Sequence, residues 1–79
     1  MDLCQPCREL DRVLSEIDLG EITYESLDIY KQDRLELTNL KVRGVPTMIL
    51  YSDATKQVEL KRFTGSMSKN NLMIWLGLQ

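Results

Sequence analysis

Histidine is absent from this 79-residue sequence and cysteine occurs only twice, so soft metal ligands are scarce. A tetrahedral zinc site takes its ligands mostly from cysteine and histidine. One chain therefore cannot close such a site from these residue types, although two chains could share one. Two cysteines are also too few for the several disulfides that staple a small secreted domain.

Charge of either sign is not in large excess, and long apolar runs are missing. Ten basic and twelve acidic residues give a net charge of −2, which argues against nucleic acid or membrane as an electrostatic partner. No window approaches the roughly 18 apolar residues of a membrane span, and no basic-then-apolar secretory leader is present. We therefore expect a soluble, cytoplasmic protein that forms a single domain over residues 1–79.

The two cysteines form a Cys4-Gln5-Pro6-Cys7 motif at the start of a helix-patterned segment. A disulfide between residues this close closes too short a loop to restrict the unfolded chain much, so stability explains the pair poorly. A helix N-terminus stabilises a thiolate through its unpaired N–H groups and the positive end of its dipole. With Cys4 at the N-cap position, the motif favours two-electron sulfur chemistry.

Hydrophobic spacing predicts three helices and three strands. Apolar residues at intervals of three and four indicate helices, and alternating or continuous apolar runs indicate strands. The last two strands are expected to pair as an antiparallel hairpin, with the first of them the most buried strand and covered on both faces. The expected elements in order are a helix that follows Cys4 and has its apolar spacing over 8–19, a strand over 21–29, a helix over 31–40, strands over 47–51 and 58–63, and a helix after Gly65 capped by Ser66 or Ser68.

Three separated motifs stand in a specific order along the chain. Cys-Gln-Pro-Cys opens a helix, Val-Arg-Gly-Val-Pro-Thr over 42–47 leads into an apolar strand, and Phe-Thr-Gly over 63–65 closes the hairpin before the last helix. In this order and spacing the chain resembles the thioredoxin-like superfamily over nearly its whole length. The resemblance implies an α/β fold in which helices pack on a small mixed sheet, in the order α-β-α-β-β-α.

The same resemblance implies how a site would work. Cys4 attacks a substrate disulfide, and Cys7 then displaces the reduced substrate and leaves a Cys4–Cys7 bond. In the family, the proline that corresponds to Pro46 is cis and lies beside the cysteines, and the backbone of the preceding residue, here Val45, pairs with substrate. A glycine after the hairpin, here Gly65, lies near the same groove. This chemistry needs no metal and no organic cofactor.

Two departures from the family pattern bear on this prediction. Leu3 stands where thioredoxins usually have tryptophan, and only three residues precede Cys4 where the family has a strand that carries a buried aspartate. This first strand, which is missing or vestigial, belongs between the strands expected at 21–29 and 47–51. The flanking strands could pair directly, another copy could fill the gap in a homodimer, or Met1 could be an internal residue of a longer chain.

The leading hypothesis is a thiol-disulfide oxidoreductase, an electron carrier that reduces or exchanges protein disulfides. Its partners are then protein disulfide substrates and a disulfide reductase or a small-thiol reductant. Two other functions stay open: a truncated thioredoxin-fold binding module without turnover, and a dimer bridged by zinc through the cysteine pairs of two chains. The simplest structural interpretation makes the cysteines small buried apolar residues without a role in chemistry.

Overall fold

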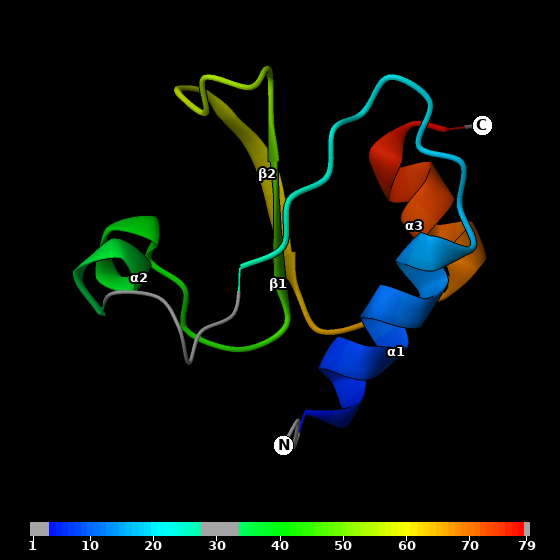
Figure 1. Cartoon of the computed structure of the whole chain (residues 1–79), viewed down its shortest axis with the longest axis horizontal. Helices are drawn as coiled ribbons and strands as arrows, with labels where there is room; N and C mark the ends of the chain where they lie inside the picture. The colour runs from blue at the N-terminus through cyan, green and yellow to red at the C-terminus, as the bar shows by residue number, and fades with distance from the viewer. Residues whose placement is uncertain (1–3, 28–33, 79) are drawn as a thin grey trace.

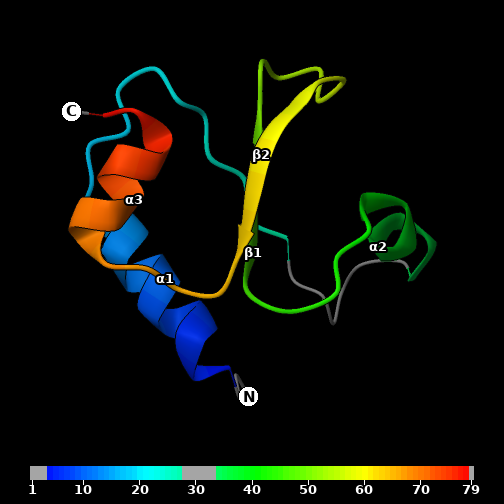
Figure 2. The ribbon, with the colours of Figure 1, turned by 180° about the vertical axis from the view of Figure 1, so that it is seen from behind.

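The computed structural model describes residues 4–27 and 34–78, and in that part of the chain it shows a small α/β protein. Figure 1 shows a β-hairpin with helices on both sides of it: α1 and α3 lie on one side and α2 lies on the other, as Figure 2 shows from behind. The elements are α1 (Gln5–Ser15), α2 (Arg34–Leu40), β1 (Thr47–Tyr51), β2 (Glu59–Thr64) and α3 (Lys69–Leu76).

Helix α1 begins after Cys4, as the predicted N-cap requires, and ends four residues before the predicted Leu19. Cys4 is its N-cap, and Pro6 lies in the first turn, where a missing N–H costs nothing. At the other end the Glu16 N–H donates to the Val13 carbonyl at 3.1 Å and the Ile17 N–H donates to the Leu14 carbonyl at 3.3 Å. These i to i−3 bonds tighten the last turn and end the helix, although Ile17 still belongs to the buried side.

The hydrophobic core lies between α1 and α3. Leu10 and Val13 of α1 are each 4% exposed, and Leu72 of α3 is fully buried at 0%. Ile17 completes this cluster, and the sheet adds Met48, which packs against it from β1. Helix α2 has no buried residue. The fold therefore depends on one small core that a few apolar side chains form.

The hairpin confirms the predicted antiparallel pairing. Strand β1 has the predicted bounds, and Thr47 lies opposite Thr64 and Ile49 opposite Arg62. Its burial differs from the prediction: every residue of β1 is only half-buried, while β2 is mostly exposed. The helices cover the sheet thinly, because α2 has no buried residue and Met48 is the one described sheet residue that packs against the core, so β1 is the more buried strand without being enclosed on both faces.

The predicted strand over 21–29 is wrong for residues 21–27, which form no strand, and residues 28 and 29 lie outside the described part of the chain. A strand needs a neighbour for its backbone bonds, and none of the described residues provides one here. Side chains hold the segment instead: the Tyr24 hydroxyl donates to Asp11 at 3.4 Å, and the Lys56 ammonium donates to Glu25 at 2.7 Å. Direct pairing of this segment with β1 is therefore absent among the described residues.

The second predicted helix is confirmed over Arg34–Leu40, and its expected first residues, 31–33, lie outside the described ranges. The final helix is also present. Ser68, one of the two predicted caps, accepts the Asn71 N–H at 3.2 Å, and the left-handed Gly77 ends the helix at φ 76°.

This cap predicts a difference between two nearby serines. Ser68→Ala removes the acceptor for a helix N–H and should lower the free energy of unfolding by about 1 kcal/mol. Ser66→Ala, at an exposed loop position before the cap, should change it by less than about 0.5 kcal/mol. Urea unfolding followed by circular dichroism measures both, and equal losses in the two variants would contradict the capping role of Ser68.

Candidate functional site

Cys4 and Cys7 are joined by a disulfide at the N-terminus of α1, with their Cα atoms 5.2 Å apart. Both residues are half-buried. Cys4 has extended backbone angles, φ −97° and ψ 99°, which place it at the N-cap as predicted. Its Sγ accepts the backbone N–H of Cys7 at 3.2 Å. The positive end of the helix is thus directed at the Cys4 sulfur.

The second predicted part of the site is the loop before β1. The Val45–Pro46 peptide bond is cis, as predicted. The Gly65 N–H donates to the Pro46 carbonyl at 2.8 Å, so the structure brings these two predicted residues together across the base of the hairpin. Gly65 has a φ of 112°, a backbone conformation that residues other than glycine rarely adopt. Val45 is 39% exposed.

Hydroxyl groups support this loop from β1 and β2. Thr47 Oγ1 donates to the Gly44 carbonyl at 2.6 Å and lies 3.1 Å from Thr64 Oγ1. A Cβ at Gly44 would come within 3.3 Å of the Thr64 methyl group, which explains a small residue there. The sequence motif Val-Arg-Gly-Val-Pro-Thr therefore reflects a bonded turn, in which threonine and glycine fix the backbone on either side of the cis peptide.

The cysteine pair and this loop come from different layers of the molecule. Figures 1 and 2 place the N-terminal end of α1 and the start of β1 toward the same end of the fold. The described hydrogen bonds join Pro46 to Gly65 and join Cys4 to its own helix.

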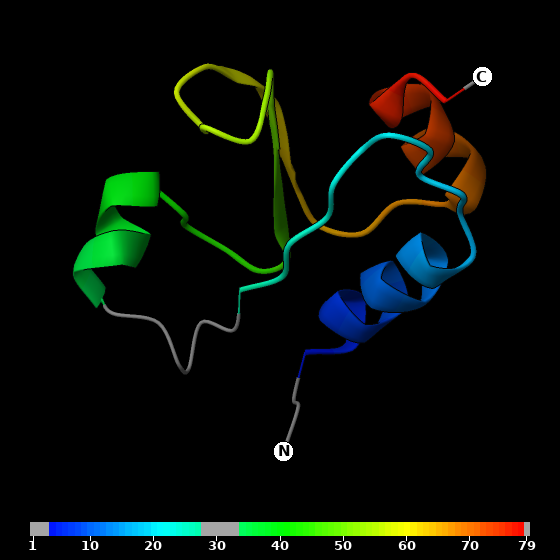
Figure 3. The ribbon, with the colours of Figure 1, turned by 45° about the horizontal axis from the view of Figure 1, so that its top comes forward.

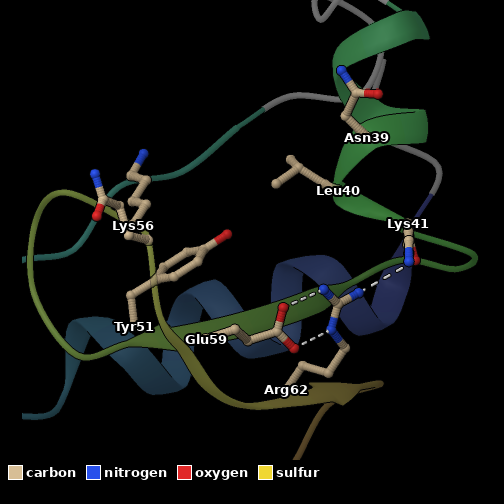
Figure 4. A pocket seen from close by; sticks show the side chains of 8 residues that line it. Asn39, Leu40, Lys41, Tyr51, Lys56, Glu59 and Arg62 are labelled. Atoms are coloured by element: carbon tan, nitrogen blue, oxygen red, sulfur yellow. Dashed lines mark hydrogen bonds and ion pairs between the residues drawn. The ribbon is translucent and has the colours of Figure 1, made fainter.

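A surface cleft of about 330 Å³ lies on the other side of the hairpin, against α2 (Figure 4). No sequence motif marks it, because its walls come from α2, β1, β2 and the hairpin turn. Two of its cations are already paired: Arg62 Nε donates to Glu59 at 2.7 Å and Arg62 also reaches the Lys41 carbonyl at 3.2 Å, while Lys56 pairs with Glu25. The cleft residues are Asn39, Leu40, Lys41, Tyr51, Lys56, Gln57, Glu59 and Arg62.

The Arg62–Glu59 pair predicts a small, pH-dependent contribution to stability. The hydrogen bond from Arg62 holds the pKa of Glu59 below its ordinary value of 4.5. A lowered folded-state pKa stabilises the fold above about pH 4.5, and this contribution is lost as the pH falls through the lowered pKa. Glu59→Gln should therefore lower the urea midpoint slightly at pH 7 and hardly at all near pH 3.

Glu21→Gln, at an exposed glutamate for which the described residues offer no ion pair, is the matched control for this variant. It should leave the urea midpoint unchanged at pH 7. A Glu59→Gln midpoint that falls by the same amount at both pH values would show that packing, and not charge, explains the loss.

Neither a membrane-spanning helix nor a metal-binding cluster is present in the described part of the chain, and comparison with known proteins finds no match. None of the described helices is long and apolar enough to cross a membrane. Within residues 4–27 and 34–78, no group of three or more cysteine, aspartate or glutamate side chains is placed to hold a metal ion. The chain matches no known family model, no curated protein and no solved structure.

Proposed function

We propose that this protein is a thioredoxin-like thiol-disulfide oxidoreductase, with Cys4 as the nucleophile and Cys7 as the resolving thiol. The single observation that carries the proposal is the position of the Cys4 sulfur at the N-cap of α1, where it accepts the Cys7 N–H at 3.2 Å. In a redox pair one cysteine attacks a disulfide as a thiolate and leaves as a thiolate when the disulfide is reduced. The N-cap position stabilises the thiolate of Cys4.

Activation of Cys4 follows from the same geometry. A free cysteine has a pKa of about 8.5 and is mostly protonated at neutral pH, whereas only the thiolate attacks a disulfide. In the reduced protein the N–H of Cys7 and the helix dipole stabilise negative charge on Cys4 Sγ. We expect the pKa of the Cys4 thiol to lie below that of a free cysteine.

The proposed cycle transfers two electrons through sulfur alone. The Cys4 thiolate attacks one sulfur of a substrate disulfide, the substrate S–S bond breaks, and the other substrate sulfur leaves as a thiolate. Cys7, after losing its proton, attacks Cys4 Sγ and releases the second substrate thiol. The substrate is then reduced to two thiols and the protein holds the Cys4–Cys7 disulfide. A disulfide reductase or a small thiol returns the pair to the reduced state.

The substrate is proposed to lie along the loop that contains Val45 and Pro46. Val45 is 39% exposed, and no described residue forms a backbone hydrogen bond with it. The hydrogen bond from the Gly65 N–H to the Pro46 carbonyl holds the loop in one conformation. Little conformational entropy of the loop is therefore lost when an extended peptide pairs with the Val45 backbone. Protein disulfides in extended segments are the substrate class that this loop suits.

The alkylation rate of the reduced protein tests the activation of Cys4. Iodoacetamide is added over a pH series and the modified cysteine is identified by mass spectrometry. We expect Cys4 to react first, with a midpoint below that of a free thiol. A Cys4 midpoint at or above about 8.5 would remove the activation argument.

Turnover separates the proposed enzyme from a binding module that merely carries reactive cysteines. With dithiothreitol as reductant, the proposed enzyme reduces insulin disulfides faster than dithiothreitol alone, and a binding module does not. Metal analysis of the reduced, purified protein tests the zinc-bridged dimer, for which about half an equivalent of zinc per chain is expected because two chains share one ion.

A further inference from the structure

Strand β1 has a hydrogen-bonded neighbour on only one side among the described residues. The Gly65 N–H bonds to the Pro46 carbonyl, and Met48 lies opposite Phe63. Since bonded and non-bonded pairs alternate in an antiparallel ladder, Met48 and Leu50 bond to β2, and the backbone groups of the residues between them point away from it. The register shifts between Leu50 and Tyr51, and beyond the shift the Ser52 N–H donates to the Val58 carbonyl at 3.0 Å, which leaves Tyr51 in a non-bonded pair with Glu59. The outer edge of β1 therefore presents the N–H and C=O groups of Thr47, Ile49 and Tyr51.

The two edges of this hairpin differ in chemistry. Strand β1 reads Thr-Met-Ile-Leu-Tyr, without charge, proline or glycine, whereas β2 carries Glu59, Lys61 and Arg62. Charged residues on an edge strand hinder pairing with another chain, and an uncharged β-branched and aromatic edge favours it. The edge of β1 is thus the one that can accept a strand.

The segment 22–27 does not block this edge with backbone bonds. It passes the hairpin on its way from the α1 side to the α2 side (Figure 3), and no described backbone hydrogen bond joins it to β1. The contacts of Tyr24 with Asp11 and of Glu25 with Lys56 involve exposed side chains. Exposed ion pairs contribute little stability, so an incoming strand displaces this segment at small cost.

We propose that a second copy of this chain pairs with β1, antiparallel and about a two-fold axis through Ile49. The two hairpins then form one four-stranded sheet in the order β2–β1–β1–β2. Ile49 lies opposite the partner's Ile49, and Thr47 lies opposite the partner's Tyr51. These are the residues whose backbone groups point outward, so the pairing satisfies them with about six hydrogen bonds.

Side chains of β1 favour a second copy over an unrelated strand. Met48, which packs against the α1–α3 core, lies opposite the partner's Leu50 and continues the apolar layer from one copy into the other. No charged side chain meets its own copy on the axis. The corresponding pairing along β2 would place Arg62 against the partner's Arg62, and like charges directly opposite each other destabilise a sheet. The interface is independent of the proposed redox chemistry.

Sedimentation and hydrogen exchange of the unmodified protein test this pairing. Both are measured from about 10 μM to about 1 mM with excess reductant, which removes any disulfide between chains. We expect a monomer–dimer equilibrium in which the Ile49 amide becomes protected as concentration rises. The Met48 amide, bonded to β2, is protected throughout, and the Arg62 amide stays unprotected. A monomer at every concentration, or protection that grows at Arg62 and not at Ile49, would overturn the proposal.

A pair of matched variants provides the second test. Ile49→Lys places two like charges on the two-fold axis and should weaken dimerisation at least about tenfold. Leu60→Lys makes the same change on β2, where Leu60 is 58% exposed, and should leave dimerisation unchanged. Circular dichroism shows whether each variant is folded. If Ile49→Lys is unfolded, the amide protection pattern of the unmodified protein tests the β1 interface instead. Equal dimerisation in the two folded variants contradicts a β1 interface.

Discussion

Cys4→Ser is expected to abolish disulfide reduction, so that insulin is reduced no faster than by dithiothreitol alone. A serine hydroxyl is not ionised near neutral pH and cannot replace the thiolate that attacks the substrate. The variant keeps an oxygen at the N-cap, where serine is a preferred residue, so the helix itself should persist. The loss is therefore one of chemistry, measured as the insulin reduction rate with circular dichroism as the check on folding.

Cys7→Ser is the matched variant, and it should fail at a different step. Cys4 still attacks, but no second thiol displaces the substrate, so a mixed disulfide with the substrate accumulates. Mass spectrometry without reductant detects this adduct, which should be absent from Cys4→Ser. If Cys4→Ser reduces insulin at the unmodified rate, or if Cys7→Ser forms no adduct while Cys4→Ser does, the assigned roles are wrong.

Leu72→Ala is expected to cause the largest loss of stability of any single substitution in the core. Leu72 is fully buried at 0% exposure and packs in the cluster of α1 residues that includes Leu10 and Val13. Truncating such a leucine costs about 2–5 kcal/mol, which is much of the roughly 5–15 kcal/mol that holds a typical domain folded. In a core this small, we expect the variant to be largely unfolded at 37 °C.

Ile74→Ala is the control within the same helix, because Ile74 is 60% exposed. Its effect on the free energy of unfolding should stay below about 1 kcal/mol. Thermal unfolding of both variants, followed by circular dichroism, measures the difference. Comparable losses at the two positions would mean that the buried face of α3 differs from the one described.

Local signals were sufficient for several parts of this structure. The N-cap position of Cys4, the cap at Ser68 and the bounds of β1 follow from residue types and spacing that act over one turn or one strand. The pairing of β1 with β2 also follows from a short connection between an apolar run and an alternating one. In each case the hydrogen-bond donors and acceptors that pair are close in sequence, so the local residue pattern is enough to predict the interaction.

Predictions that depended on distant neighbours succeeded less well. Residues 21–27 alternate as a strand should, yet they form none because no described strand lies beside them to complete their hydrogen bonds. Strand β1 was expected to be enclosed and is half-buried, since a short α2 without buried residues covers one side. The cleft against α2 was missed because its residues come from four separate segments.

The sequence by itself determined the local chemistry of this protein: a cysteine pair that opens a helix, the residues that cap and end the helices, and a hairpin with one uncharged strand. Only the tertiary structure decided that Gly65 bonds to Pro46 and that the outer edge of β1 lacks a described neighbour. The physical reason is the distance along the sequence between the groups that interact. Capping and turn formation are settled within a few residues, whereas a β-strand exists only when another segment satisfies its backbone.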